Sequence, residues 1–553
     1  MRIAVYDAWL HTLGGGEKHM LEAALALGKR HEVHVHSHRP VTRKTLELAT
    51  GLSLGSLKIC IEPNTPAGDF SRRFRDYDFF INSTHDSLLP NPCRRGVRLL
   101  FFPPPRPNRV LAAAARAAGA AARILGCPRY SEGFYGPERV GRGWYRNTGR
   151  AAEITIAGSR NAQFRFMAGN ASEEPKIVTL FVDGQEVHRT NVPPTKGDFT
   201  PVGPMAAPST DEASSSIRIQ VSDVTAAHNA GNYEDREIGI AVADPNTDSL
   251  PELPYRLLTQ RLFPRLGEGI ERLNSAGGRD ALASYDRIVA NSHFTGEWLR
   301  RWWDLPCHVV HPPVEAIGAP SSIDQHSSSI DHHPSSFPQP HSSFPRKRES
   351  TLTTTCKRPE ILSVGRFFVG GHGKNHRMMI EAFAQMVRRE GLTGWTLRLI
   401  GASGSTPADR DYLSDLRSLA GSLSVQIETD VDVNRIRNAY RRASIYWHAA
   451  GFGRNEKRHP ESFEHFGIAP VEAMSAGAVP VVFEGGGVRE TVEDGKSGYL
   501  WRSPSQLRHI SWRLIRDASL RNHLAAGAAE RSREFSPAKF RKAFADIVEG
   551  LIP

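Results

Sequence analysis

The chain has few cysteines, and none of them is placed for a structural framework. Its five cysteines are odd in number, lie far apart and form no CxxC pair. This pattern excludes a disulfide scaffold and a zinc ribbon, and it predicts a reducing compartment.

Long hydrophobic runs are also missing. No stretch reaches the roughly 20 apolar residues that a membrane-spanning helix requires. The first residues, MRIAVYDAWLHTLGGGEKH, contain only a short apolar run that ends at Asp7, too short for a signal peptide. We therefore expect a cytoplasmic protein whose contact with a membrane is at most peripheral, at its inner face.

The composition has no extreme bias that would indicate disorder. The 553 residues are 39% hydrophobic and 23% charged, which is typical of a soluble globular protein with three to four domains. The net charge of +11 favours phosphate-bearing partners such as nucleotides or an anionic membrane surface. No motif in the chain supports recognition of nucleic acid.

Changes in composition and hydrophobic periodicity along the chain predict its domains. RIAVY (2–6), a glycine turn and a helical pattern open a doubly wound α/β domain, and EILSVGRFF opens a second one after 358. Between them lie β-rich runs without helical period and a Ser/Pro/His-rich segment of low complexity. The predicted parts are an N-terminal Rossmann-like domain (1–149), an inserted all-β sandwich (150–249), the rest of the N-terminal domain (250–315), a disordered linker (316–357) and a C-terminal Rossmann-like domain (358–553), whose last helix can cross back to the N-terminal domain.

The segment FEHFGIAPVEAMSAG (463–477) is the strongest motif. Its glutamates, Glu464 and Glu472, are separated by seven residues. Pro470 suits a first helical turn and Gly477 a helix end, which places Glu464 on a loop after a strand and Glu472 inside the helix. The free N–H groups near Gly467 would then form an anion site.

The glycines after the first strand, Gly14 to Gly16, let the backbone approach a phosphate or sugar, although a tight turn alone also explains them. They lack the spacing of a dinucleotide fingerprint, and the second strand, HEVHVHS, ends without an acidic residue. Hydride-transfer chemistry is therefore disfavoured.

These motifs resemble glycosyltransferase family 4, the retaining GT-B enzymes with an E-x7-E segment. The resemblance spans both α/β domains, and EHFGI and GGGE look closest to the mannosyltransferase branch. It also covers SVGRF (363–367), KNH (374–376), GGVRETVEDGKSGYL (486–500), YDRIVANSHFTGEWLRR (285–301) and GGGEKH (14–19).

The resemblance implies a role for each matching residue. Glu464 would contact the donor sugar, Glu472 the ribose of the nucleotide, and Arg366 with Lys374 the diphosphate. Fixed cations and helix-end N–H groups suit that chemistry, because negative charge develops on the departing phosphate. The other positions expected at the donor are Gly15, Gly16, Gly365, Gly467, Ile468 and Ala469.

Two departures from the family pattern affect these expectations. The loop FFVGGHG between Arg366 and Lys374 is longer than usual, and its glycines form either a backbone nest for phosphate or a flexible turn. Phe101 stands where many relatives carry a histidine. His85, at the end of a predicted strand, is the candidate substitute, or else an ordinary loop histidine.

A DxD sequence and an alanine-rich segment each have a simpler reading. Asp430-Val431-Asp432 resembles a metal-binding DxD, but it directly precedes a helix, where Asp432 fits an N-cap. We therefore predict no metal requirement and no cofactor besides the nucleotide-sugar substrate. LAAAARAAGAAARILG (111–126) is either a membrane-facing edge or a packed helix.

The resemblance therefore implies a retaining hexosyltransferase that moves a sugar from a nucleotide-diphosphate donor to a glycan or lipid-linked acceptor. Its nearest branch implies mannose as the sugar. Two alternatives remain open. One is a sugar-nucleotide epimerase or phosphorylase on the same fold. The other is a non-catalytic carbohydrate-binding protein whose β insertion reads the glycan.

Overall fold

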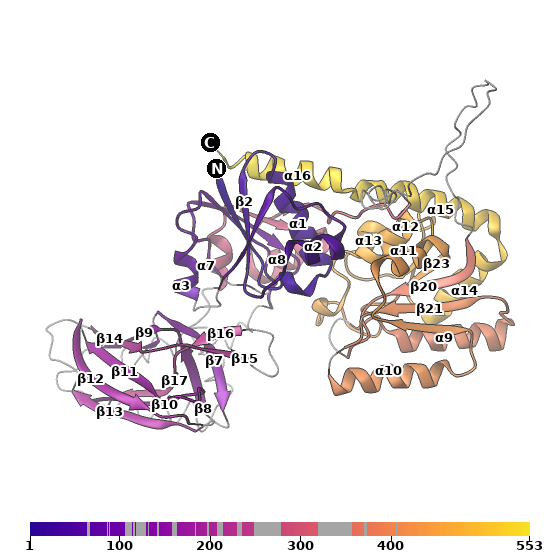
Figure 1. The fold of residues 1–553 in the computed structure, drawn as a ribbon. Coiled ribbons are helices and arrows are strands. Elements are labelled where there is room, and N and C mark those ends of the chain that lie inside the picture. Colours follow the sequence, from indigo (N-terminus) through magenta and orange to yellow (C-terminus); the bar gives the residue numbers. More distant parts are fainter. Residues whose placement is uncertain are drawn as a thin grey trace, which may run out of the picture.

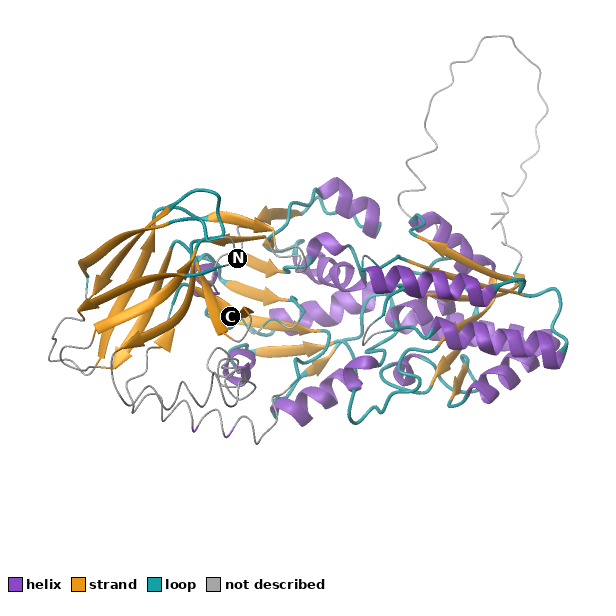
Figure 2. Ribbon diagram, turned by 90° about the horizontal axis from the view of Figure 1, so that it is seen from below, coloured by secondary structure: helices purple, strands orange, loops and turns teal. Residues whose placement is uncertain are grey.

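The computed structural model describes most of the chain and shows two α/β domains and a β sandwich arranged in a row (Figure 1; Figure 2). The sandwich lies at one end, the N-terminal domain in the middle and the C-terminal domain at the other end. The described residues are 1–552 except 63–66, 86, 88, 106–112, 114–116, 118–128, 131, 141–142, 158–162, 183, 196–197, 207–213, 229–234, 248–277, 319–356, 370–372 and 405.

The N-terminal domain is built on a parallel sheet whose central strands are short runs of buried, mostly β-branched and aromatic residues. Its seven described strands are, in spatial order, β19 (His308–Val309), β18 (Arg287–Ala290), β5 (Arg95–Leu100), β4 (Phe79–Asn82), β1 (Arg2–Tyr6), β2 (Glu32–Ser37) and β3 (Leu57–Ile61). The described helices of this domain include α1 (Gly15–Leu27), α2 (Arg43–Thr50), α3 (Ala67–Arg72), α7 (Gly278–Ala283) and α8 (His293–Trp303).

The chain leaves this sheet after β5 and returns to it at β18, which pairs with β5. The excursion forms two antiparallel sheets around one apolar core that contains Phe164 and Phe166. The described strands of one sheet are β13 (Thr200–Ala206), β10 (Gln163–Gly169), β17 (Ala241–Thr247), β8 (Gly143–Thr148) and β7 (Phe134–Val140); those of the other are β12 (Gln185–Val192), β11 (Lys176–Val182), β14 (Ser214–Val221), β9 (Ala151–Ala157) and β6 (Arg129–Tyr130), with a separate hairpin of β15 (Thr225–His228) and β16 (Asp235–Ile238).

The sandwich starts earlier than the expected boundary at 150. Strands β6 to β8 precede residue 150 and belong to the sandwich: β6 pairs with β9, β8 pairs with β17, and β7 pairs with β8. Their sequence, from Arg129 to Thr148, is interrupted by glycine, proline and arginine, so it lacks the apolar alternation that reveals a strand. Only their partners across the sheets define them.

The C-terminal domain repeats the doubly wound plan. Its described strands form a parallel sheet in the order β22 (Val425–Thr429), β21 (Thr396–Gly401), β20 (Arg358–Val364), β23 (Ala443–His448), β24 (Val479–Phe483) and β25 (Tyr499–Trp501). Its described helices are α9 (His376–Glu390), α10 (Pro407–Ala420), α11 (Val433–Arg442), α12 (Ile468–Ser475), α13 (Val488–Thr491), α14 (Pro504–Arg516) and α15 (Ala518–Ser532). The strand order reverses between β20 and β23, where such sheets bind ligands.

The last helix, α16 (Pro537–Glu549), lies on the N-terminal domain (Figure 1). Phe540 and Phe544 join the apolar core that also contains Met20 of α1. Arg541 adds an ion pair with the buried Glu22, with 2.5 Å between Nε and Oε2. The end of the described chain therefore ties the two α/β domains together.

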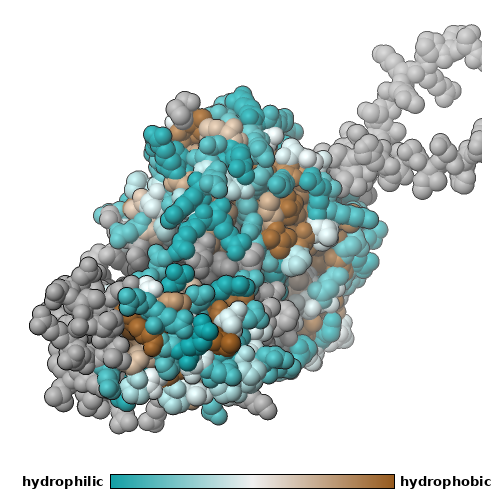
Figure 3. Space-filling model, turned by 60° about the vertical axis from the view of Figure 1, so that its left-hand side comes forward, coloured by the Kyte–Doolittle hydropathy of each residue, from teal (hydrophilic) through white to brown (hydrophobic). Residues whose placement is uncertain are grey.

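Among the described helices, none combines the length and the apolar composition needed to cross a bilayer. On the face shown in Figure 3, hydrophilic side chains cover most of the described surface, and hydrophobic ones form small separate patches. Nearly all of the alanine-rich segment at 111–126 and nearly all of the linker expected at 316–357 lie outside the described residues.

Candidate active site

Two loops at the switch point of the C-terminal sheet bring Lys374 and Glu464 together. Lys374 lies between β20 and α9, and Glu464 lies between β23 and α12. Because β20 and β23 are neighbouring parallel strands, their carboxyl ends meet at one edge of the sheet. His448, the last residue of β23, lies at the same edge.

The three side chains form a charged cluster. Oε2 of Glu464 accepts hydrogen bonds from Nζ of Lys374 at 2.6 Å and from Nε2 of His448 at 3.0 Å. Burial by itself would raise the pKa of Glu464, but the charge of Lys374 and the hydrogen bond from His448 outweigh it and hold that pKa well below its ordinary value. Glu464 is therefore a carboxylate at neutral pH, an acceptor for hydroxyl groups.

Burial also lowers the pKa of His448, despite its contact with Glu464. His448 is therefore neutral at physiological pH and donates through Nε2, while its buried Nδ1 has no hydrogen-bond partner among the described atoms. His448 is not among the residues predicted from the sequence. A sequence pattern does indicate it, because His448 is the last residue of the apolar run SIYWH, and ligands bind at the carboxyl ends of such strands.

The stem of Lys374 explains the glycine at position 365. A Cβ on Gly365 would lie 2.6 Å from Cγ of Lys374, closer than real side chains pack. Arg366, the next residue, places its guanidinium 5.1 Å from the centre of the Phe368 ring. Of the loop glycines that follow, Gly370 and Gly371 lie outside the described residues, so the expected backbone nest is not tested.

The N-terminus of α12 points into the same region. Gly467 is its N-cap with φ of 100°, a conformation that strongly favours glycine, and none of the described side chains caps the helix. The N–H groups of Ile468 and Ala469 in the first turn are thus available to an anion. Glu472 lies inside this helix, as the motif predicts.

Across the cleft, Gly15 of the N-terminal domain approaches α12 directly. A Cβ on Gly15 would lie 2.9 Å from Cδ1 of Ile468, so the domains contact each other here without room for a side chain. A Cβ on Gly16 would meet the ring of Phe101 at 3.6 Å. The two domains are also joined by Phe102, whose ring stacks on His465 with centroids 4.1 Å apart.

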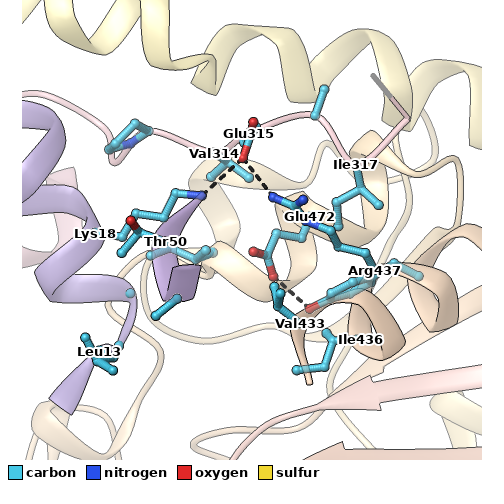
Figure 4. A pocket seen from close by; sticks show the side chains of 17 residues that line it. Leu13, Lys18, Thr50, Val314, Glu315, Ile317, Val433, Ile436, Arg437 and Glu472 are labelled. Atoms are coloured by element: carbon cyan, nitrogen blue, oxygen red, sulfur yellow. Dashed lines mark hydrogen bonds and ion pairs between the residues drawn. The ribbon is translucent and has the colours of Figure 1, made fainter. Parts of the chain in front are cut away.

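A cavity of about 200 Å³ lies between the domains, and Glu472 lines it (Figure 4). Tyr440 donates its hydroxyl to Oε2 of Glu472 at 2.9 Å. Burial raises the pKa of Glu472 and raises that of Tyr440 well above its ordinary value, so Tyr440 remains a donor. Glu472, the residue expected at the ribose, therefore lies in a cavity between the two domains.

An ion-pair bridge crosses the same cavity (Figure 4). Oε2 of Glu315 lies 3.3 Å from Nζ of Lys18, on α1, and 3.1 Å from a terminal nitrogen of Arg437, on α11. None of these three residues is among those predicted from the sequence. They come from three distant segments, and no local pattern connects them.

The remaining predicted residues are more dispersed. His85 is exposed on the loop after β4, and it does not line the described cavity. Asp432 is the N-cap of α11, since its Oδ1 accepts the N–H of Arg435 at 3.0 Å, which confirms the simpler reading of the DxD sequence.

One part of the chain matches a known protein family. Residues 347–531 match the model of the family "Glycosyl transferases group 1". This confirms the expected family for the C-terminal domain, and the two Rossmann-like domains flanking a cleft confirm the expected GT-B architecture.

Individual relatives cover limited parts of the chain. It is 28% identical over 206 residues to the GDP-Man:Man(3)GlcNAc(2)-PP-Dol alpha-1,2-mannosyltransferase of Mus musculus, covering 35% of this chain and 38% of that protein's length. It is 59% identical over 39 residues to the alpha-1,3/1,6-mannosyltransferase ALG2 of Dictyostelium discoideum, covering 7% of this chain and 9% of that protein. A solved structure of Anabaena HepE with UDP and glucose aligns with 100% of both chains at 13% identity and a TM-score of 0.49.

Proposed function

We propose that the protein is a retaining glycosyltransferase that uses a nucleotide-diphosphate sugar as donor. The observation that carries this proposal is the cluster of Lys374, Glu464 and His448 beside the open N-terminus of α12. It combines a cation and free N–H groups for a diphosphate with an ionised carboxylate for sugar hydroxyls.

Each group has a defined task in the reaction. The ammonium of Lys374 and the N–H groups of Ile468 and Ala469 stabilise the negative charge that grows on the departing diphosphate. Lys374 has three N–H donors, so it can bind a phosphate oxygen while it keeps its bond to Glu464. Glu464, held ionised, accepts hydrogen bonds from the sugar and fixes its orientation.

The configuration of the sugar is retained if the acceptor attacks from the face that the diphosphate leaves. The departing phosphate oxygen then takes the proton of the acceptor hydroxyl, and no protein base is required. This route fits the site, because its carboxylate, Glu464, is already bonded to Lys374 and His448.

The interdomain cavity suits the nucleoside of the donor. Glu472 can accept the two ribose hydroxyls, while Ile436 and Ile468 provide apolar walls. The names of the mannosyltransferase relatives favour mannose as the sugar and GDP as its carrier.

Transfer is proposed to be independent of metal, because Lys374 and α12 supply the positive charge that a divalent cation would otherwise provide. The acceptor is proposed to be a glycan or a lipid-linked saccharide presented by the N-terminal domain at the cytoplasmic face of a membrane. Sedimentation with anionic but not neutral liposomes tests that contact.

The test of the function is transfer and hydrolysis of UDP-, GDP- and ADP-sugars by the purified full chain. We expect one donor to be consumed, by transfer with retained configuration when an acceptor is added, and at an unchanged rate in EDTA. Glu464→Gln should lose turnover, whereas the control Glu461→Gln, an exposed residue three positions earlier, should keep it. Glycan binding without consumption of any donor would support the carbohydrate-binding alternative and refute the proposal.

A further inference from the structure

A second cluster of polar side chains lies on the N-terminal sheet, outside the cleft. Along β2 the side chains alternate, so that Val33 and Val35 join the core with α1 and α16, while His34 and His36 face the opposite side. Both histidines are buried, at 3% and 4% exposure. Figure 1 shows α3 on this side of the sheet, away from α16.

Three potential ligands converge there. Cys60 on β3 is paired directly with His36 on β2, so its side chain lies on the same face. One donor atom from each of His34, His36 and Cys60 lies within 4.8 Å of the others. Tyr77 also reaches the centre, with its hydroxyl 2.7 Å from Nδ1 of His34 and 3.1 Å from Nε2 of His36.

Each imidazole is held from behind by a carboxylate. Nε2 of His34 lies 2.8 Å from Oε1 of Glu32, and Nδ1 of His36 lies 3.0 Å from Oε1 of Glu62. A carboxylate accepts hydrogen bonds, so the outer nitrogen of each ring carries a hydrogen. In the tautomer with no second hydrogen, the inner nitrogen presents a lone pair. Metal-binding histidines are oriented in this way by carboxylates behind them.

With both rings in this tautomer, the centre has one acceptor more than it has donors. Two inner lone pairs face Tyr77, but its hydroxyl has one hydrogen and can serve only one of them. A cation bound between the rings would satisfy both lone pairs. Nitrogen and sulfur donors select a borderline-soft ion such as Zn²⁺ over Ca²⁺ or Mg²⁺, which prefer oxygen ligands.

We propose that His34, His36 and Cys60 bind one Zn²⁺, with the hydroxyl of Tyr77 or a water as the fourth ligand. Tetrahedral zinc holds its donor atoms about 3.4–3.8 Å apart, so the present spacing requires only small side-chain rotations. The ion ties β3, the edge strand, to β2 and to the loop before β4. Because the site lies on the other face of the sheet from α1, its role is structural and separate from transfer.

The test uses the full chain, freed of metal with a chelator and titrated with Zn²⁺ and with Co²⁺ as a coloured probe. We expect one equivalent of Zn²⁺ to bind and to raise the melting temperature, and Co²⁺ to give the charge-transfer band of a thiolate ligand. Cys60→Ser should abolish that band, and His36→Gln should weaken Zn²⁺ binding at least about tenfold.

Glu62→Gln is the subtler variant, because it leaves all three ligands in place and should still weaken Zn²⁺ binding about 10- to 100-fold. Cys307→Ser is the control for cysteine, being partly buried and free like Cys60. His311→Gln is the control for another group that could hold a metal, His293, His311 and Glu490. The proposal is wrong if the full chain does not bind Zn²⁺ stoichiometrically. It is also wrong if binding survives Cys60→Ser but is lost in His311→Gln. Circular dichroism verifies that each variant is folded.

Discussion

The backbone N–H of Phe294, in the first turn of α8, donates to Oε1 of Glu490 at 2.7 Å, and the two residues belong to different domains. The neighbouring N–H, of His293, donates to Oε2 at 2.8 Å, and His311 contacts the same oxygen at 3.1 Å. A carboxylate of the C-terminal domain thus completes a helix end in the N-terminal domain. Its charge is favourable there, since the N-terminus of a helix is positive.

This contact predicts a pH-dependent stability. Burial would raise the pKa of Glu490, but the hydrogen bonds from His311 and from the two N–H groups outweigh it and lower that pKa. A lowered carboxyl pKa contributes stability above the ordinary value of 4.5, and this contribution is lost as the pH falls through the folded-state pKa. We expect Glu490→Gln to lower the free energy of unfolding by about 1 kcal/mol at pH 7, as loss of a helix cap does. Below pH 4.5, the free energy of unfolding of the variant should fall less steeply with pH than that of the wild type. Urea unfolding at a series of pH values measures this, with the more exposed Glu493→Gln as control.

Removing the cation at the proposed diphosphate site should slow the chemical step. Lys374→Met is expected to raise the barrier by about 2.7–4 kcal/mol, a loss of about 10²- to 10³-fold in kcat. It should also destabilise the fold by up to about 3 kcal/mol, because Glu464 loses its partner. The exposed Lys457→Met serves as the control.

The double variant Lys374→Met with Glu464→Gln separates the two effects. With no uncompensated carboxylate left, its stability should return toward that of the wild type while transfer stays lost. Recovery of transfer together with stability would mean that the pair is structural and not catalytic.

Glu472→Gln should improve stability at the expense of donor binding. Burial raises the pKa of Glu472, so the folded state holds the proton more tightly, and stability falls as the pH rises above 4.5 through the raised pKa. Glutamine removes this loss, so the melting temperature at pH 7 should rise. Donor KM should increase about 10- to 150-fold if a charged hydrogen bond to ribose is lost. Glu381→Gln, on the exposed face of α9, should change neither quantity, and an unchanged KM in Glu472→Gln would contradict the ribose role.

Glu315→Gln tests whether the ion-pair bridge restrains binding. The carboxylate neutralises Lys18 and Arg437, which line the cavity with it, and these three side chains are 19–38% exposed. Freeing both cations should tighten binding of a nucleoside diphosphate by about two- to fivefold at low salt, with little change in stability. Isothermal titration at two ionic strengths measures this, and the gain should shrink at high salt. Weaker binding in the variant would show that Glu315 positions the two cations instead.

Much of the fold and part of the site followed from local sequence patterns. Strand, glycine turn and helix recur at the start of both α/β domains, and the helix carrying Glu472 has its turn glycines where the motif predicts them. These elements are specified by neighbouring residues, so periodicity and capping rules are sufficient. Strands β6 to β8 were missed because they are stabilised by pairing with β9 and β17, which no local pattern reports.

The contacts that complete the site depend on tertiary structure. Lys18 and Glu315 are separated by 297 positions in sequence, and only the packing of the domains brings them to one cavity. The same is true of Cys60, whose place beside His36 depends on the register of β2 and β3. His448 could be recognised once the strand order was known, because only then does its strand end at the switch point.

The return of α16 to the N-terminal domain determines when that domain can become native. Its partner Arg541 follows Glu22 by 519 positions, so α1 leaves the ribosome long before the helix that covers it. Until α16 has been made, Met20 and its apolar neighbours lack their contacts with Phe540 and Phe544. The core of the N-terminal domain therefore stays incomplete while the ribosome synthesises the sandwich and the C-terminal domain. The N-terminal domain is therefore the first to be synthesised and among the last to complete its core. A chain truncated before Pro537 would lack α16, and its N-terminal domain would be exposed to proteolysis.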